Sequence, residues 1–192
     1  MTTFAAIILI GLILVGVFII LTYNNLIALI EAINNASRNI DVQLDRRFKV
    51  FESLIAVVKK TMDYEKSTLS EIVGLRNQAQ QAHLTGDEAA RIAAENKISG
   101  VAAGINVVFE QYPELKANQQ AQQLQEEIVS TENKLAFAKQ ALNDAIERYE
   151  VKKKSLFEAM VVAMLPNLNK KFQYWSIDAT KVVAMENYKV NL

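Results

Sequence analysis

The segment IDVQLDRRF, residues 40–48, decides how this chain packs because it places a charge on the face of a helix that is otherwise apolar. At about 100° per residue, Arg47 falls in the middle of that face. The apolar residues around it are Ile40, Leu44, Phe48 and Phe51. A buried charge is costly unless it is paired and hydrogen-bonded, so Arg47 predicts an acidic partner. The alternative is that its stem lies on apolar surface and its head stays in water.

Composition limits the classes of protein to which the chain can belong. It has 192 residues, 51% of them hydrophobic, with no cysteine, one histidine and two prolines. This is typical of a helical protein with one domain and one anchor, and it excludes disulfides. The 21 basic and 21 acidic residues cancel. A nucleic-acid-binding protein usually carries a basic patch, so nucleic acid is not an expected partner.

The first residues predict a transmembrane anchor over 1–22. The run FAAIILIGLILVGVFIILT, residues 4–22, carries no charge. As a helix it spans roughly 28 Å, about the thickness of the hydrocarbon core of a bilayer. A cleaved signal peptide is disfavoured, because no basic residue precedes the run and no small-x-small site follows it. Basic residues follow the span and none precedes it, which predicts an outside N-terminus and a cytoplasmic C-terminal domain.

Beyond the anchor, apolar residues recur at the spacing of one helix face. The first run has no proline and ends near Gly86, which predicts one uninterrupted helix over about 23–82. Asp87 and Glu88 suit the first turn of a second helix, which extends to about 112. It ends there because the residue before a proline is disfavoured in a helix.

A third helix is predicted over about 118–165, where apolar or small residues follow a seven-residue repeat and Pro166 ends the run. The predicted fold is therefore all-α. A transmembrane helix continues into an antiparallel bundle or coiled coil of long helices over 23–165, followed by a tail over 166–192.

Nothing in the sequence predicts an enzyme. The single histidine, His83, has no second histidine or cysteine with which to hold a metal. Glu-x-x-His pairs, glycine-rich phosphate loops and nucleophile elbows are absent from the sequence. We therefore expect no catalytic activity, no metal and no cofactor.

Three stretches of the sequence resemble the LemA family of bacterial membrane-anchored helical proteins. They are YNNLIALIEAINNASRNIDVQLDRRFKVFESLIAVVKK (23–60), YEKSTLSEIVGLR (64–76) and YPELKANQQAQQLQEEIVSTENKLAFAK (112–139). The resemblance covers residues 23 to about 150. It departs at FES (51–53), where the family usually has proline and asparagine, so the chain resembles a divergent member. The resemblance implies no established enzymatic activity, an anchor in the bacterial inner membrane with its N-terminus outside, a cytoplasmic helical bundle and, in some members, a part in membrane organisation.

Two further charges, Glu65 and Arg76, lie within the apolar stripe of the first predicted helix and each needs a partner. Counting the rise along antiparallel helices brings Glu132 within one or two turns of Arg76. We therefore predict an Arg76–Glu132 ion pair, with Lys139 as the partner of Glu65.

The same counting leaves the stretch from 23 to about 51 uncovered by any other part of the chain. This predicts a homo-oligomer in which the first helices pack side by side at the membrane. The predicted interface residues are Ile33, Ile40, Leu44, Phe48 and Phe51, with Arg47 facing Asp41 and Asp45 of a neighbouring copy.

The favoured function is a self-assembling helical scaffold that organises or shapes the bacterial inner membrane. Its expected partners are the lipid bilayer and further copies of itself. The alternative is a membrane-anchored adaptor that uses its bundle to bind another membrane protein, such as a protease or a sensor. The tail residues Lys170, Lys171, Phe172, Tyr174 and Trp175 are typical of a membrane interface. A continuous third helix would place them about 100 Å from the anchor. Docking on the bundle or on a neighbouring copy is therefore preferred for them.

Overall fold

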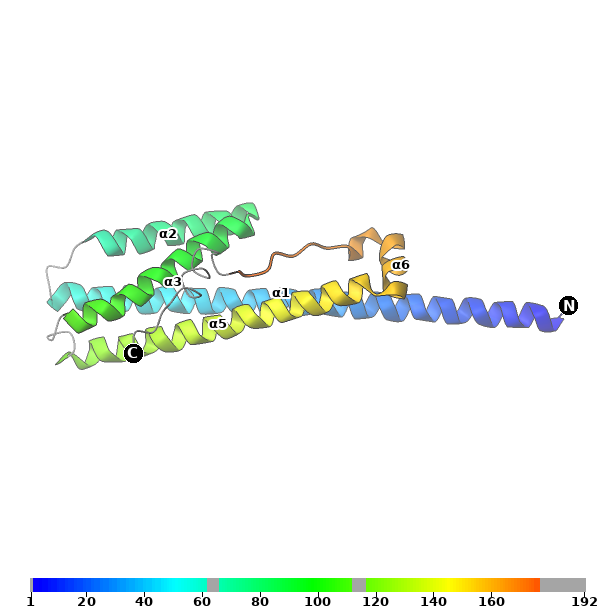
Figure 1. The fold of residues 1–192 in the computed structure, drawn as a ribbon, viewed down its shortest axis with the longest axis horizontal. Coiled ribbons are helices and arrows are strands. Elements are labelled where there is room, and N and C mark those ends of the chain that lie inside the picture. The colour runs from blue at the N-terminus through cyan, green and yellow to red at the C-terminus, as the bar shows by residue number, and fades with distance from the viewer. Residues whose placement is uncertain (1, 62–65, 112–116, 177–192) are drawn as a thin grey trace, which may run out of the picture. The chain divides into compact units, whose positions relative to one another are not determined.

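The computed structural model describes residues 2–61, 66–111 and 117–176, most of which are helical (Figure 1). These described residues contain no strand, which confirms the all-α prediction. The elements are α1 (Thr2–Thr61), α2 (Lys66–Thr85), α3 (Glu88–Gln111), α5 (Gln119–Lys154), α6 (Leu156–Met164) and the 3-10 helix η1 (Pro166–Leu168).

The chain divides into two compact units, and both α1 and α5 contribute to each of them. Unit 1 is drawn from residues 1–39 and 139–174. Unit 2 is drawn from residues 40–138 and 175–192.

The N-terminal part of α1 has the properties of a membrane anchor. Its most apolar window of 18 residues has a mean hydropathy of 3.3, and none of that window is buried. The exposed large apolar side chains from Phe4 to Leu21 have exposed fractions of 40–69%. Among the described residues, α1 is the one helix long and apolar enough to cross a bilayer. This agrees with the predicted anchor over 1–22.

In unit 2, α2 runs antiparallel to the end of α1. The guanidinium carbon of Arg76 in α2 lies 3.4 Å from the centre of the Phe48 ring in α1, and its Nη2 is 3.6 Å from Asp45 Oδ1. Ile72, one turn earlier in α2, belongs to the same core cluster as Phe51, which lies later in α1. Because the contacts progress in opposite directions along the two helices, the chain must reverse between them.

The predicted single helix over 23–82 is therefore wrong. α1 ends at Thr61 and α2 begins at Lys66, while residues 62–65 lie outside the described part of the chain. Apolar periodicity could not reveal this reversal, because the two arms of a helical hairpin show the same spacing as one long helix. The reversal places α2 beside α1 instead of farther from the anchor.

All four long helices contribute to the core of unit 2. Val50, Phe51, Leu54 and Val57 come from α1, Ile72 and Leu75 from α2, Ile98 from α3, and Ala121 and Ile128 from α5. Burial of each large apolar side chain in this cluster contributes about 1.5–3 kcal/mol. The cluster holds the helices in position around the charged residues described below.

The turn between α2 and α3 forms as predicted. Gly86 has φ 75°, a left-handed conformation that favours glycine. Its N–H donates to His83 O (3.2 Å), and the Asp87 N–H donates to Ala82 O (2.9 Å), the two bonds of a Schellman motif. Asp87 Oδ1 in turn accepts from Ala90 N–H (2.9 Å) and caps α3.

α5 carries the predicted seven-residue repeat, but it ends earlier than expected. Buried residues recur along α5 at seven-residue intervals, namely Ala121, Ile128, Leu135, Leu142 and Tyr149. The predicted helix over 118–165 is interrupted at Ser155, whose φ of −63° and ψ of 146° are extended. α5 therefore ends at Lys154, and α6 is a separate helix that ends before Pro166.

After η1, the chain is tied back onto α5 within unit 1. The hydroxyl of Tyr149 donates to Leu168 O and accepts from Lys170 N–H (2.8 Å). Lys153 Nζ donates to Lys170 O (3.0 Å), and the Phe172 ring lies edge-on to Tyr149 at 5.4 Å. These contacts join the residues that follow α6 to the end of α5, which precedes it.

The ion pairs of Glu150 are expected to make the stability of unit 1 depend on pH. Burial raises the pKa of Glu150, but the hydrogen bonds from Lys153 (2.5 Å) and Lys154 (3.1 Å) outweigh burial and hold the pKa below its usual 4.5. A lowered folded-state pKa stabilises the fold above the unfolded-state pKa, and this stabilisation is lost as the pH falls through the folded-state value.

We therefore expect Glu150→Gln to lower the melting temperature at neutral pH and to have no effect at a pH below the folded-state pKa. Thermal melts monitored by circular dichroism across the acid range measure this difference. Glu147→Gln changes an exposed residue on the same helix and serves as the control. A Glu150→Gln effect that persists unchanged in acid would contradict the proposed ion pairs.

Candidate functional site

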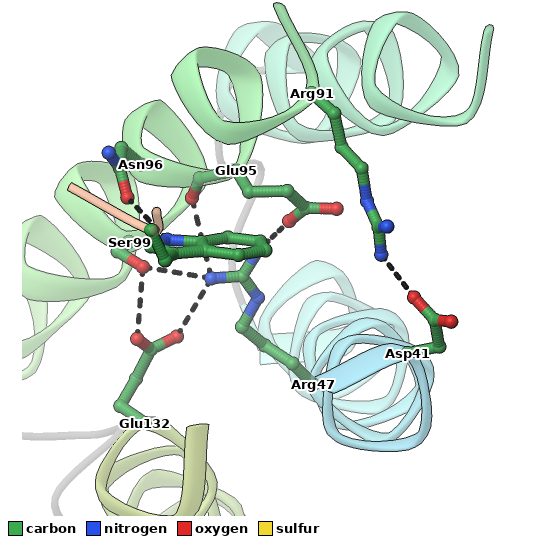
Figure 2. Close-up of polar contacts among 8 residues, drawn as sticks. Asp41, Arg47, Arg91, Glu95, Asn96, Ser99 and Glu132 are labelled. Atoms are coloured by element: carbon green, nitrogen blue, oxygen red, sulfur yellow. Dashed lines mark hydrogen bonds and ion pairs between the residues drawn. The ribbon is translucent and has the colours of Figure 1, made fainter. Parts of the chain in front are cut away.

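Arg47 lies at the centre of a charged cluster that joins α1, α3 and α5 in unit 2 (Figure 2). Its side chain is only 2% exposed. Its Nη2 pairs with Glu95 Oε2, and its Nη1 donates to Ser99 Oγ (2.8 Å) and to Glu132 Oε1 (3.3 Å). The sequence prediction that Arg47 is buried is therefore confirmed. The prediction that its acid lies in another copy of the chain is wrong, because both carboxylates belong to the same chain.

Ser99 links Arg47 to the carboxylate of Glu132. Its hydroxyl accepts from Arg47 and donates to Glu132 Oε2 (3.0 Å), so both of its polar functions are used. Glu95 is 9% exposed and Glu132 is 26% exposed. A buried ion pair offsets its desolvation only when further hydrogen bonds satisfy the charges, and these contacts supply them.

A second buried arginine, Arg91, joins α3 to α1 on the neighbouring side of the cluster. Its side chain is 5% exposed, and its Nη2 pairs with Asp41 Oδ1. Its Nη1 donates to His83 Nδ1 (2.9 Å) and lies 3.4 Å from Glu88 Oε2. Arg91 thus ties the turn between α2 and α3 to α1.

The tryptophan of the tail docks beside this second arginine. Trp175 is buried, and its indole N–H donates to Asn96 Oδ1 (3.4 Å). Asn96 Nδ2 donates to Ser176 O (2.9 Å), and the guanidinium of Arg91 lies 5.9 Å from the indole ring. Trp175 therefore packs on the helices of its own chain, as preferred from the sequence.

Arg76 does not pair with Glu132, so this predicted ion pair is wrong. Arg76 stacks on Phe48 and faces Asp45, whereas Glu132 pairs with the buried arginine of α1. The hydrogen bond from Lys49 lowers the pKa of Asp45, burial opposes this effect, and the charges of Lys49 and Arg76 add to it. The prediction failed because it placed Arg76 on a continuous first helix.

The Glu65–Lys139 pair is not tested. Glu65 lies outside the described residues, and Lys139 is half-buried in α5. This pair stays a prediction.

Four of the eight predicted oligomer-interface residues are buried within a single chain. Exposed fractions are 2% for Ile33, 1% for Ile40, 2% for Arg47 and 1% for Phe51. The remaining predicted interface residues range from half-buried to exposed, namely Asp41, Leu44, Asp45 and Phe48. The sequence prediction left these residues uncovered because it counted the helical rise along one continuous helix and did not include the reversal after Thr61. The apolar stripe of α1 around Arg47 therefore no longer supports the prediction of self-assembly.

A cavity of about 320 Å³ lies between α1, α2 and α3 beside the cluster. The charges of its lining arginines and acids cancel. The arginines are Arg47, Arg76 and Arg91, and the acids are Asp41, Asp45 and Glu95. Each of these arginines already has a carboxylate partner. An anion site needs a base that is free to bind, so this arrangement favours a structural role that locks the helices together.

Within the part of the chain that the structure describes, no group of three or more histidine, cysteine or acidic side chains could hold a metal ion. His83 is exposed, at the end of α2, with Arg91 and Glu88 as its neighbours. The absence of a catalytic function stays a prediction.

The charged cluster lies in a part of the chain that a known family shares. The model of the LemA family matches residues 36–191, which include every member of the cluster. The chain belongs to the LemA family. No individually curated protein matches it. The match to the LemA family begins after the apolar segment of α1, so the evidence for the anchor comes from the sequence and exposure of that segment.

Sequence reasoning missed the partners that this LemA family member supplies from α3. Glu95, Ser99 and Arg91 fall on one helix face together with the apolar Ile92 and Ile98 at about 100° per residue. This is the same signal that drew attention to Arg47, a charge within an apolar stripe. Applied to the second predicted helix, it would have identified Arg91 and Glu95 as buried.

Proposed function

We propose that this LemA family member is a single-pass membrane protein that self-assembles into a helical scaffold and organises or shapes the bacterial inner membrane. The difference in exposure of apolar side chains between the two ends of α1 supports the anchor. Its N-terminal part exposes large apolar side chains, whereas Val50, Phe51, Leu54 and Val57 bury theirs in the core of unit 2. Exposed apolar side chains at this density are costly in water and favourable in a bilayer.

The proposed topology has an outside N-terminus and a cytoplasmic helical domain. It is supported by basic residues that follow the apolar segment and by their absence before it. Arg47 is buried, whereas Arg38, Arg46 and Lys49 are exposed. Exposed basic residues therefore follow the span on the side proposed to be cytoplasmic.

The proposed role is structural and not catalytic. Three arginines of unit 2, Arg47, Arg76 and Arg91, pair with carboxylates across α1, α2, α3 and α5. Such cross-links stiffen a bundle and use up the groups that general acid–base chemistry would need.

Self-assembly needs a surface other than the stripe around Arg47. Val129 and Phe137 of α5, eight residues apart, are 46% and 72% exposed. They lie about 80° apart around the helix, so they share one outward face. We propose this face of unit 2 as the contact between copies.

We expect the purified protein in mild detergent to form large assemblies alone, and Phe137→Glu to reduce their size. Light scattering after size exclusion, with electron micrographs of the same fractions, measures this. Gln78→Glu adds the same charge at an exposed position of α2, away from this face, and serves as the control. Small particles for the parent protein would contradict the scaffold and favour the alternative of a membrane-anchored adaptor for another membrane protein.

A further inference from the structure

The outward face of α6 is apolar. Leu156, Phe157, Met160 and Met164 have exposed fractions of 62–76%. At about 100° per residue these four side chains fall within a sector of about 100°. An exposed apolar patch of this kind on a short helix usually marks a contact surface.

The one charged residue of α6, Glu158, faces the protein instead of water. Val161 and Val162 are buried on the side opposite the apolar sector. Glu158 lies on that side as well, where it is 13% exposed and pairs with Lys152 Nζ (2.5 Å). A helix on a water-exposed surface normally shows the reverse arrangement, with its charged residues outward.

Within unit 1, α6 lies beside the predicted membrane span. The Phe157 ring contacts the Phe18 ring of α1 edge-on, with 6.3 Å between ring centres. Phe18 lies four residues before Thr22, the last residue of the predicted span, so it is about 6 Å inside that end of the span. Interfacial helices bury their apolar face about 5–10 Å into the boundary between headgroups and acyl chains.

The chain on both sides of α6 is held in place. Ser155 breaks the helix before α6. After it, the hydroxyl of Tyr149 and the ammonium of Lys153 bind the backbone of Leu168 and Lys170. The apolar sector is therefore presented in a defined direction and not on a loose tail.

The residues that flank α6 carry a net positive charge. Residues 150–171 contain five lysines and two glutamates, which leaves +3. Lys154, Lys170 and Lys171 are exposed. Positive side chains near a membrane surface are attracted to anionic lipid headgroups.

We infer that α6 is a second membrane contact, which inserts its apolar sector into the lipid leaflet at the cytoplasmic end of the α1 anchor. Its partner is a bilayer that contains anionic phospholipid. The inference rests on the proposed anchor, because the position of α6 is measured from Phe18. α6 thus lies at the anchor, whereas a continuous third helix would place the residues that follow it about 100 Å away.

Because the chain has no cysteine, single introduced cysteines can carry a fluorescent probe. The full-length protein is placed in lipid nanodiscs that contain phosphatidylglycerol. Labels are compared at Met160→Cys in the apolar sector, at Ile13→Cys in the anchor and at Leu84→Cys, which is 73% exposed in unit 2. Met164→Cys is a second probe of the sector in case Met160→Cys does not fold. Quenching is measured with a spin label on the lipid acyl chain and with iodide in water.

We expect severalfold stronger lipid quenching at Met160 than at Leu84, with iodide quenching in the opposite order. Lipid quenching at Ile13 without lipid quenching at Met160 or Met164 would overturn the inference and leave the anchor standing. No lipid quenching at Ile13 would overturn the anchor. Protection of Met160 from both quenchers would mean that a second copy covers the sector, which also overturns the inference.

The lipid headgroup is tested with the same labelled protein. In nanodiscs of phosphatidylcholine alone, we expect lipid quenching at Met160 to fall while quenching at Ile13 stays the same. Equal quenching at Met160 in both lipids would overturn the role of anionic phospholipid.

Discussion

Arg47→Met is expected to lower the free energy of unfolding by about 3–5 kcal/mol, the usual cost of removing one partner from a buried ion pair. Methionine is unbranched and apolar like the stem of arginine, so the packing of the stem is kept. The loss arises because Glu95, which is 9% exposed, keeps its charge without the guanidinium that it pairs with. Ser99 also loses its donor.

Urea unfolding in mild detergent, followed by the emission of the single tryptophan, measures this change. Trp175 packs on unit 2 beside Arg91 and Asn96, so its emission reports the unfolding of that unit. The matched control is Arg46→Met. Its side chain is 44% exposed and pairs with Glu127, which is 43% exposed, so we expect a loss of about 1 kcal/mol or less. Equal losses for the two variants would contradict the buried role of Arg47.

A double variant separates the cost of removing the guanidinium beside Glu95 from the packing of Arg47. Arg47→Met together with Glu95→Leu removes both members of the closest pair. Replacing a buried ion pair with apolar residues is often neutral, so we expect the double variant to be more stable than Arg47→Met alone. A double variant less stable than Arg47→Met would mean that Glu95 is not left uncompensated.

Phe51→Ala is expected to lower the free energy of unfolding by about 3–5 kcal/mol. Phe51 is 1% exposed in the core cluster, among residues contributed by four helices. Its removal leaves a cavity in addition to the lost burial of the ring. The same urea titration measures the effect.

Leu84→Ala provides the matched control for this substitution. Its side chain is 73% exposed on α2, so we expect a change within about 0.5 kcal/mol. The pair tests whether Phe51 is covered within one chain. A Phe51→Ala effect as small as that of Leu84→Ala would mean that the core cluster does not form in the single chain.

Much of the secondary structure could be predicted because its signals are local. The end of α2 follows from Gly86, which supplies the left-handed conformation that the turn needs. The seven-residue repeat of α5 predicted its buried face from Ala121 to Tyr149. The break at Ser155 had no such signal, since serine is tolerated in helices and no glycine or proline lies between residues 114 and 165.

The candidate site could be predicted only in part. The burial of Arg47 follows from its place within the stripe of α1, and that prediction holds. Its partners do not follow, because Glu95 and Glu132 lie 48 and 85 residues away in the sequence. The partners were predicted by counting the helical rise from the anchor, which assumed one uninterrupted first helix. Because the chain reverses after Thr61, that count gives the wrong position along the bundle for every later residue.

The sequence by itself determined which segments are helical, which segment is apolar enough to cross a bilayer, and that Arg47 would be buried. These properties depend on residues within a few turns of one another, where helical periodicity relates position to exposure. Only the tertiary structure decided that α2 folds back on α1, that α3 and α5 supply the acids for Arg47, and that α6 lies beside Phe18. The physical reason is that periodicity defines which face of a helix is buried and not which helix covers it. That choice is made by the direction of the chain between helices and by the fit of distant side chains to one another.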